Sequence, residues 1–285
     1  MGWIILGHTY LNALKEPLQN PTFVDELFSR SSFSIVVAAP FAVDVFFYMT
    51  GFLTTYLLSS DVHHRDGRVP NILFLYIHRI FRLVPLYALT LLAFVWIFPL
   101  YGDGPIFFQY RTKVDTCERL WWTNLLFINN FYDEWCMGWT WYLPNDMQFF
   151  LAAPILVWIF FKRRAVAYTL LILLLLGSFA GTLYITNYYS LMVSYRNVKP
   201  NYYESYYNVP WCRCGPFILG MFFGFGYFSF KYIDREASKM TRVSLLIRDK
   251  RILRWTGYLL GLGIINTCIF LQYPLNNHPQ DTTSL

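Results

Sequence analysis

Long apolar segments separated by short polar ones run along almost the whole chain. Six of them are long enough to cross about 30 Å of hydrocarbon as α-helices, which rise about 1.5 Å per residue. These segments are residues 35–59, 83–101, 139–161, 165–186, 215–233 and 255–273. Because a helix satisfies its backbone hydrogen bonds internally, the pattern predicts an all-α fold, a polytopic transmembrane helix bundle with six complete spans.

Two further apolar segments are too short to span a bilayer. Residues 1–11 begin without a basic stretch, so they are not a signal peptide, and we expect them to be the outer half of a partial first helix. Residues 120–131, which include Trp121 and Trp122, predict a short interfacial or re-entrant helix. The chain also stops about a dozen residues after its last span. We therefore expect residues 1–285 to be one membrane domain, either a fragment of a larger protein or a chain whose start has been misplaced.

The composition agrees with a membrane protein. Apolar residues make up 56% of the chain and charged residues 14%, against about a quarter charged in soluble domains. The net charge of +6 does not indicate nucleic acid, because most of the 23 basic residues lie in the segments 60–82, 162–164 and 231–254. The positive-inside rule places these segments in the cytoplasm. We expect membrane lipids and no nucleic acid as partners, in the plasma membrane or an endomembrane. No feature of the sequence indicates an oligomeric state.

Four of the five cysteines lie in loops on the opposite, exoplasmic side. They are Cys117, Cys136, Cys212 and Cys214, and thiols on that side tend to be oxidised. Cys117 and Cys136 flank the segment 120–131, so we predict a disulfide between them that closes this loop. Zinc is an alternative for the four thiols, but no histidine or C-x-x-C spacing supports it, and we expect no bound metal.

Three ionisable residues are predicted to lie in the outer third of the membrane. Asp44 interrupts the apolar segment 43–53, where a charge costs several kcal/mol and is usually kept for an ion path, a proton relay or a reaction. Helix rise counted from the outer ends places Asp44 roughly 13 Å deep, Asp146 roughly 10 Å and His8 roughly 5 Å. We expect the three to converge in one cavity open to the exoplasm. Alternatively, the aspartates only join helices by hydrogen bonds, and His8 caps its helix.

Polar residues accompany Asp146 within its span. Asn145 and Gln148 lie beside it, and Pro144 is expected to break the helix there. Such a group would be costly against lipid, so we expect it to face protein or a water-filled cavity. The predicted substrate-binding residues are Trp139, Tyr142, Asn145 and Gln148.

Two arginines precede the span 83–101, where the chain enters the bilayer from the cytoplasm. Arg79 and Arg82 are three residues apart and hence on one face of a helix. Two guanidinium groups there could bind phosphate groups bidentately. Equally, they could extend to lipid phosphates, as basic residues at helix ends do.

Several of these stretches, in this order, resemble the acyltransferase-3 family of multi-pass membrane proteins, in particular its animal branch, the nose-resistant-to-fluoxetine-like proteins. The similar stretches are residues 2–10, 43–53, 79–87 and 139–150, and residues 210–220 match a later family stretch more loosely. The resemblance implies transfer of an acyl group, other than an aminoacyl group, from acyl-CoA to a hydroxyl or amine of a small-molecule, lipid or sugar acceptor. Acetyl-CoA is one candidate donor.

The resemblance also implies roles for individual residues. His8 matches the family's catalytic histidine, Asp44 its intramembrane aspartate, and Arg79 and Arg82 its paired arginines, which are thought to engage the donor. Asp146 stands where many bacterial relatives have glutamate. The chain departs from the family at both ends. The arginine of the family's first helix would precede the first residue of this chain, and the last spans of the family domain are not present in it.

A mechanism follows from these assignments. Acyl-CoA is expected to dock from the cytoplasm on Arg79 and Arg82, while His8, oriented by Asp44 or Asp146, takes the acceptor's proton as general base. Because the arginines are expected at one membrane face and His8 near the other, the acyl group would be transferred across the membrane. The alternative is a non-enzymatic lipid or drug transporter on the same bundle, since intramembrane carboxylates and a proline-broken helix also suit transport. A third hypothesis is that the chain is a purely structural or truncated protein without a function of its own.

Overall fold

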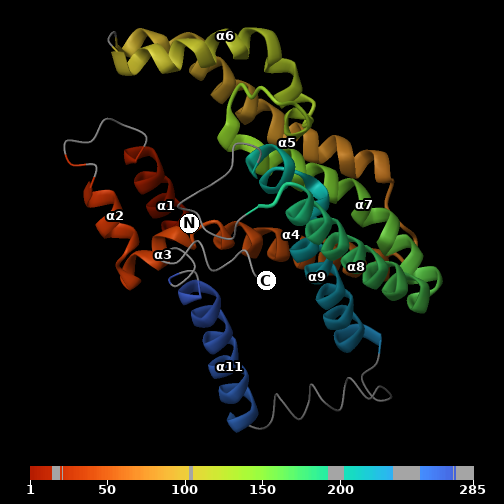
Figure 1. The fold of residues 1–285 in the computed structure, drawn as a ribbon. Coiled ribbons are helices and arrows are strands. Elements are labelled where there is room, and N and C mark those ends of the chain that lie inside the picture. The colour runs from red at the N-terminus through yellow and green to blue at the C-terminus, as the bar shows by residue number, and fades with distance from the viewer. Residues whose placement is uncertain are drawn as a thin grey trace. The chain divides into compact units, whose positions relative to one another are not determined.

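The structure, a computed structural model, describes residues 1–14, 20, 22–102, 105–191, 202–233, 251–271 and 273. These residues form helices and turns, and none of them forms a strand (Figure 1). The predicted all-α fold is therefore confirmed. The chain divides into two compact units. The first comprises Met1–Phe46, Tyr188–Pro200 and Gly226–Leu285, and the second comprises Phe47–Asn187 and Asn201–Phe225.

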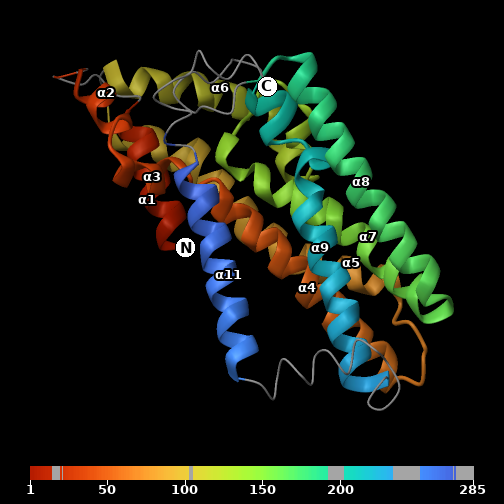
Figure 2. The same ribbon diagram turned by 60° about the horizontal axis from the view of Figure 1, so that its bottom comes forward.

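The first unit is organised around a short helix. It contains α1 (Gly2–Ala13), α2 (Thr22–Phe28), α3 (Ser34–Val37) and α11 (Arg251–Phe270). Both α1 and α11 pack against α3 (Figure 2). The indole Nε1 of Trp3 donates a 2.6 Å hydrogen bond to the carbonyl oxygen of Ile35. A Cβ atom on Gly7 would collide with the side chain of Ala39, so α1 can lie this close only because residue 7 is glycine.

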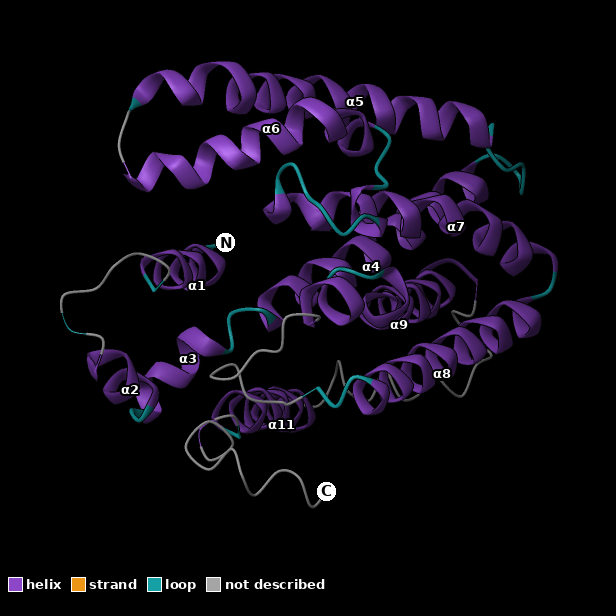
Figure 3. Ribbon diagram, turned by 45° about the horizontal axis from the view of Figure 1, so that its top comes forward, coloured by secondary structure: helices purple, strands orange, loops and turns teal. Residues whose placement is uncertain are grey.

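The second unit is a helical bundle. It contains most of α4 (Phe41–His64) together with α5 (Ile72–Leu92), α6 (Pro105–Leu125), α7 (Tyr142–Lys162), α8 (Arg164–Tyr188) and α9 (Pro210–Phe228). The π-helical turn Ala93–Ile97 and the 3-10 turn Phe98–Tyr101 extend α5, and α6 folds back along it (Figure 3). A further 3-10 turn, Gly138–Trp141, leads into α7.

Two glycines bring the backbones of α4 and α9 into direct contact. A Cβ atom on Gly51 would collide with the carbonyl oxygen of Phe217, and one on Gly220 with the carbonyl oxygen of Tyr48. Small residues allow helices in a membrane to approach in this way, because van der Waals packing replaces the hydrophobic effect as the main attraction between them. The crossing fixes the part of α4 that faces the polar residues of α7.

Among the residues that the structure describes, four helical stretches are long and apolar enough to cross a membrane. They are Phe41–His64, Ile72–Leu100, Gly138–Lys162 and Arg164–Tyr188, and Trp255–Phe270 is a shorter apolar helix. The predicted span 83–101 begins eleven residues too late, because the side chain of Asn71 caps α5 by accepting a hydrogen bond from the backbone N–H of Leu73. As a result, the two arginines predicted to precede this span lie inside its helix.

Three local predictions differ from the structure. Pro144 does not break a helix, since it lies in the first turn of α7, where its missing N–H has no intrahelical partner to lose. The segment 120–131 is not a separate short helix but the last turns of α6, followed by the 3-10 turn Asn129–Phe131. The predicted span 35–59 begins at Phe41, because Pro40 separates α3 from α4.

Candidate functional site

A buried ion pair joins α5 to α7. The Nη2 atom of Arg79 donates a hydrogen bond to Oδ2 of Asp146, with only 8% and 11% of the two side chains exposed. The guanidinium group of Arg79 also lies 4.1 Å from the ring centre of Phe150, which adds a cation–π contact. One turn away, the Tyr76 hydroxyl donates a 2.7 Å hydrogen bond to the carbonyl oxygen of Leu151. These contacts fix how α5 and α7 are aligned along their lengths.

Residues of α4 and α7 surround the pair. Thr50 lies beside both the Asp146 carboxylate and the Tyr142 hydroxyl, and the ring of Phe47 stacks on that of Tyr142 at 4.6 Å. Within the described part of the chain, two buried atoms of the pair have no hydrogen-bond partner of good geometry, namely Nε of Arg79 and Oδ1 of Asp146. A buried ion pair with one donor and one acceptor still free can bind a further polar group, such as a phosphate, a carbonyl or water.

The structure thus joins two residues for which the sequence predicted opposite faces of the membrane. Arg79 was predicted at the cytoplasmic face and Asp146 in the outer third, but their side chains touch. The error comes from the start of α5, since a helix beginning at Ile72 carries Arg79 about two turns into the bundle. Arg82, the second predicted arginine, is exposed. The joint binding of donor phosphates by the two arginines remains a prediction.

His8 and Asp44 both lie in the first unit. His8 is exposed on α1, and Asp44, partly buried, lies in the first turn of α4. Gly7, the neighbour of His8, packs on Ala39, five residues before Asp44. This contact brings the chain segments that carry the two residues together. Because Asp146 belongs to the second unit, the convergence of all three remains a prediction.

Two predicted substrate-binding residues are members of a cluster of carboxamides. Asn130 and Gln148 exchange two hydrogen bonds, of 3.1 Å and 2.9 Å. Asn145 accepts a 3.4 Å bond from Asn130 and donates to the backbone carbonyls of Trp141 and Asn208, at 3.0 Å and 2.8 Å. We call Asn130, Asn145, Gln148 and Asn208 the amide cluster. It joins three segments of the chain without any net charge.

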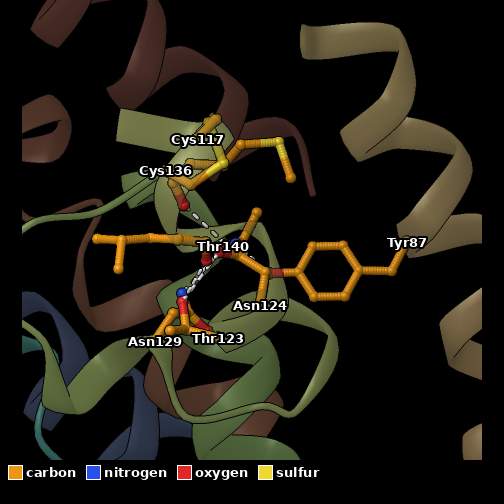
Figure 4. The surroundings of a disulfide bond; sticks show 9 residues. Tyr87, Cys117, Thr123, Asn124, Asn129, Cys136 and Thr140 are labelled. Carbon is orange, nitrogen blue, oxygen red and sulfur yellow. Dashed lines mark hydrogen bonds between the residues drawn. A yellow bond between two sulfur atoms is a disulfide. The ribbon is translucent and has the colours of Figure 1, made fainter. Parts of the chain in front are cut away.

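The predicted disulfide between Cys117 and Cys136 is confirmed, with sulfur atoms 2.03 Å apart. It links α6 to the loop before α7 and is almost fully buried. Beside it, Tyr87, Asn124 and Asn129 point toward Thr140 (Figure 4). The Thr140 hydroxyl in turn donates a 2.7 Å hydrogen bond to the carbonyl oxygen of Met137. This polar node and the disulfide together fix the start of α7 against α5 and α6.

The remaining predicted residue, Trp139, lies in the 3-10 turn that leads into α7. It is 49% exposed and packs edge-on against Phe94 at 5.2 Å. Several site residues were absent from the prediction: Thr50, Asn130, Thr140, Asn208 and Arg213. Arg213 is buried, donates a 2.9 Å hydrogen bond to the Tyr207 carbonyl and lies 4.1 Å from that tyrosine's ring centre. The consecutive asparagines 129 and 130 were the available sequence signal for part of this set.

Within the described residues, no group of three or more histidine, cysteine, aspartate or glutamate residues is placed to hold a metal ion. Arg79 and Arg82 remain the candidates for binding the phosphates of a donor, one buried and one exposed.

Comparisons with known proteins give a consistent picture. A sequence model of a protein family, described as an acyltransferase domain, matches residues 1–284. The chain is 34% identical over 249 residues to "Nose resistant to fluoxetine protein 6" of Caenorhabditis elegans, which covers 78% of the chain and 30% of that protein. It is 25% identical over 284 residues to "Regulator of hypoxia-inducible factor 1" of the same organism, covering 86% of the chain and 53% of that protein. No solved structure matches the chain.

Proposed function

This chain belongs to the acyltransferase-3 family, and on that premise we propose that it is part of a membrane-embedded enzyme. The enzyme transfers an acyl group, other than an aminoacyl group, from acyl-CoA to a hydroxyl or amine acceptor. Because the chain spans 30% and 53% of the two relatives, the proposal concerns the full-length protein. The distribution of basic residues supports a topology with Cys117, Cys136, Cys212 and Cys214 on the exoplasmic side.

The observation that carries the proposal is the ion pair between Arg79 and Asp146. A buried ion pair is weak support for stability, since apolar residues of similar volume often serve as well. Within an apolar bundle such a pair is therefore a functional candidate. In the proposal, Arg79 binds the donor through the N–H groups that Asp146 leaves free, and Asp146 positions it. Arg82, which is exposed, binds the donor's phosphates nearer the cytoplasm.

His8 acts in the proposal as general base. It removes the proton of the acceptor hydroxyl or amine, whose oxygen or nitrogen attacks the thioester carbonyl carbon. The carbon–sulfur bond then breaks, and the imidazolium returns the proton to the leaving CoA thiolate. Asp44, from the same compact unit, orients the imidazole and stabilises its charged form. General-base action of this kind contributes about 10²–10⁴-fold to the rate.

The acceptor side of the proposal uses four residues of the second unit. In the proposal, the acceptor is held by Trp139, Tyr142, Asn145 and Gln148, so it would approach from the side of the membrane at which α7 begins. The alternative function, lipid or drug transport on the same bundle, makes a different prediction, because transport leaves its substrate chemically unchanged.

Labelled acyl-CoA distinguishes the two functions. The purified full-length protein is incubated with radiolabelled acetyl-CoA or a longer acyl-CoA and a membrane lipid extract, and labelled products are separated. We expect a labelled product, and Arg79→Lys should raise KM for acyl-CoA because an ammonium group cannot form two parallel hydrogen bonds. Arg119→Lys, at an exposed arginine (67% of its side chain), is the matched control. A protein that labels no acceptor yet moves lipid between leaflets would support transport instead.

A further inference from the structure

An apolar cavity of about 440 Å³ lies beside the start of α5. Its lining consists of Val69, Pro70 and Ile72 on one side and Ile155 and Trp158 of α7 on the other. The volume falls within the range of about 300–1,000 Å³ that is usual for sites of small organic ligands. In another protein, an apolar cavity of only about 150 Å³ holds benzene. The cavity beside α5 can therefore hold a longer apolar group.

The wall on the α5 side follows from the local sequence. Val69 precedes Pro70, and a residue before proline is restricted to extended conformations, so this connection makes no helical turn. The side chain of Asn71 then starts α5 by accepting a 3.0 Å hydrogen bond from the backbone N–H of Leu73. The extended segment and the first turn of α5 together place three apolar side chains opposite α7.

The wall on the α7 side is accessible and carries a positive charge at its end. Ile155 and Trp158 are three residues apart, hence on one face of α7, and are 50% and 41% exposed. One turn further, Nζ of Lys162 lies 4.0 Å from the centre of the Trp158 ring, a cation–π contact. On the α5 side, the exposed Arg68 directly precedes Val69. Apolar walls thus end beside basic residues on both sides of the cavity.

This combination of groups matches a lipid better than a water-soluble ligand. In the proposed topology both walls lie at the cytoplasmic surface, because the segments 60–82 and 162–164 are rich in basic residues. Tryptophan and lysine at that depth are typical of the boundary between hydrocarbon and headgroups. A phospholipid offers an acyl chain to the apolar walls and a phosphate to Lys162. Cytoplasmic leaflets contain anionic lipids, which basic residues attract.

We propose that this cavity binds one acyl chain of an anionic membrane phospholipid, whose headgroup lies at Lys162 and Arg68. The site is formed by the same two helices as the buried ion pair, since Ile72 lies seven residues, about two turns, before Arg79 on α5. A bound lipid therefore contacts both helices on the cytoplasmic side of the pair. The site does not depend on the proposed acyl transfer, because lipid binding requires no turnover.

Photocrosslinking of the full-length protein in phosphatidylcholine nanodiscs tests the site. The probe is phosphatidylserine with a diazirine on one acyl chain, and the neutral comparison is phosphatidylcholine with the same diazirine. Cross-linked peptides are identified by mass spectrometry. We expect the serine lipid to label the segments 69–72 and 155–158 saturably and to be displaced by unlabelled phosphatidylserine. The choline lipid should label them with an affinity at least about fivefold lower, the factor expected for one basic residue near an anionic lipid.

Two variants with matched controls separate this site from general contact with lipid. Ile155→Trp fills the cavity and should abolish labelling at the start of α5, whereas Leu173→Trp, at a leucine of α8 that is 58% exposed, should not. Lys162→Gln should weaken binding of the serine lipid about fivefold. Lys231→Gln should leave it unchanged, although Lys231 also lies over an aromatic ring, 5.1 Å from the centre of Tyr232. Thermal unfolding shows that each variant is folded.

Two results would overturn the lipid site. Labelling that does not saturate, or that is equal for the two lipids, would mean that the cavity is an ordinary lipid-facing surface. Displacement of the probe by palmitoyl-CoA at a lower concentration than by unlabelled phosphatidylserine would assign the cavity to the acyl donor instead.

Discussion

Arg79 on α5 and Asp146 on α7 form an ion pair whose side chains are only 8% and 11% exposed. By contrast, Arg119 and Glu134, paired at 2.8 Å, have 67% and 61% of their side chains exposed. The two pairs use the same chemistry in opposite environments. The buried pair is separated by 67 residues in sequence, so it also determines which faces of α5 and α7 meet.

Removing one partner of the buried pair should destabilise the fold strongly. Asp146→Asn or Arg79→Met leaves one charge buried and uncompensated, with an expected loss of about 3–5 kcal/mol in the free energy of unfolding. Unfolding by denaturant in detergent micelles, followed by circular dichroism, measures this loss. The double variant Arg79→Met with Asp146→Leu should recover much of it, because no lone charge remains.

The exposed pair supplies the matched control. Arg119→Gln should change the free energy of unfolding by about 0–1 kcal/mol, since solvent screens the charges. If Asp146→Asn were no more destabilising than Arg119→Gln, the buried contact between α5 and α7 would be wrong.

The close crossing of α4 and α9 predicts that a larger residue in place of a glycine at the crossing lowers the stability of the fold. Gly220→Ala places a methyl group against the carbonyl oxygen of Tyr48, where backbone cannot move aside cheaply. We expect a loss of about 1–3 kcal/mol from overpacking. Gly177→Ala in α8 is the control, because a Cβ atom there meets nothing within 4 Å, and alanine favours the helix by about 1 kcal/mol. Equal melting temperatures for the two variants would exclude the close crossing.

The disulfide should contribute to stability through the loop that it closes. Cys117 and Cys136 are 19 residues apart, and a loop of this size corresponds to about 3 kcal/mol in the chain-entropy account. Replacing both by serine should therefore lower the melting temperature, and reductant should have no further effect on that variant. Cys268→Ser, at an exposed thiol, should behave as wild type. A wild-type protein that reacts fully with maleimide at Cys117 before unfolding would contradict a buried disulfide.

Loss of the Thr140 hydroxyl should destabilise the start of α7. Thr140→Val preserves shape but leaves the Tyr87 hydroxyl and the Asn124 amide short of a partner, at an expected cost of about 1–3 kcal/mol. Thr90→Val should leave the free energy of unfolding nearly unchanged, because the exposed hydroxyl of Thr90 donates its hydrogen bond to the carbonyl oxygen of Leu86 in the same helix. Hydrogen exchange of α7 amides reports the effect, and unchanged exchange in Thr140→Val would contradict the polar node.

The helices could be predicted from the sequence because their length and apolar character are local properties. The disulfide could be predicted for a similar reason, since Cys117 and Cys136 flank one loop. Helix limits were less accurate where a single polar residue sets them, as Asn71 does at the start of α5. Charged residues such as Arg119 hid the amphipathic helix α6, because the prediction followed apolar runs.

The contacts between helices could not be predicted in the same way. Hydropathy gives the depth of a residue but not the rotation of its helix, and rotation decides that Arg79 faces Asp146 while Arg82 is exposed. The partners of Asn145 and Gln148 depend likewise on loops. Asn130 and Asn208 lie in connecting segments far apart in sequence, and only folding brings them to α7.

Transfer from acyl-CoA by the full-length protein provides the most direct test of His8. Label incorporation into lipid-extract acceptors is compared for wild type, His8→Ala and His78→Ala, an exposed histidine on α5, at equal folded amounts. The general-base role predicts that His8→Ala lowers the rate by about 10²–10⁴-fold, while His78→Ala leaves it unchanged. A wild-type rate for folded His8→Ala would contradict catalysis by this histidine.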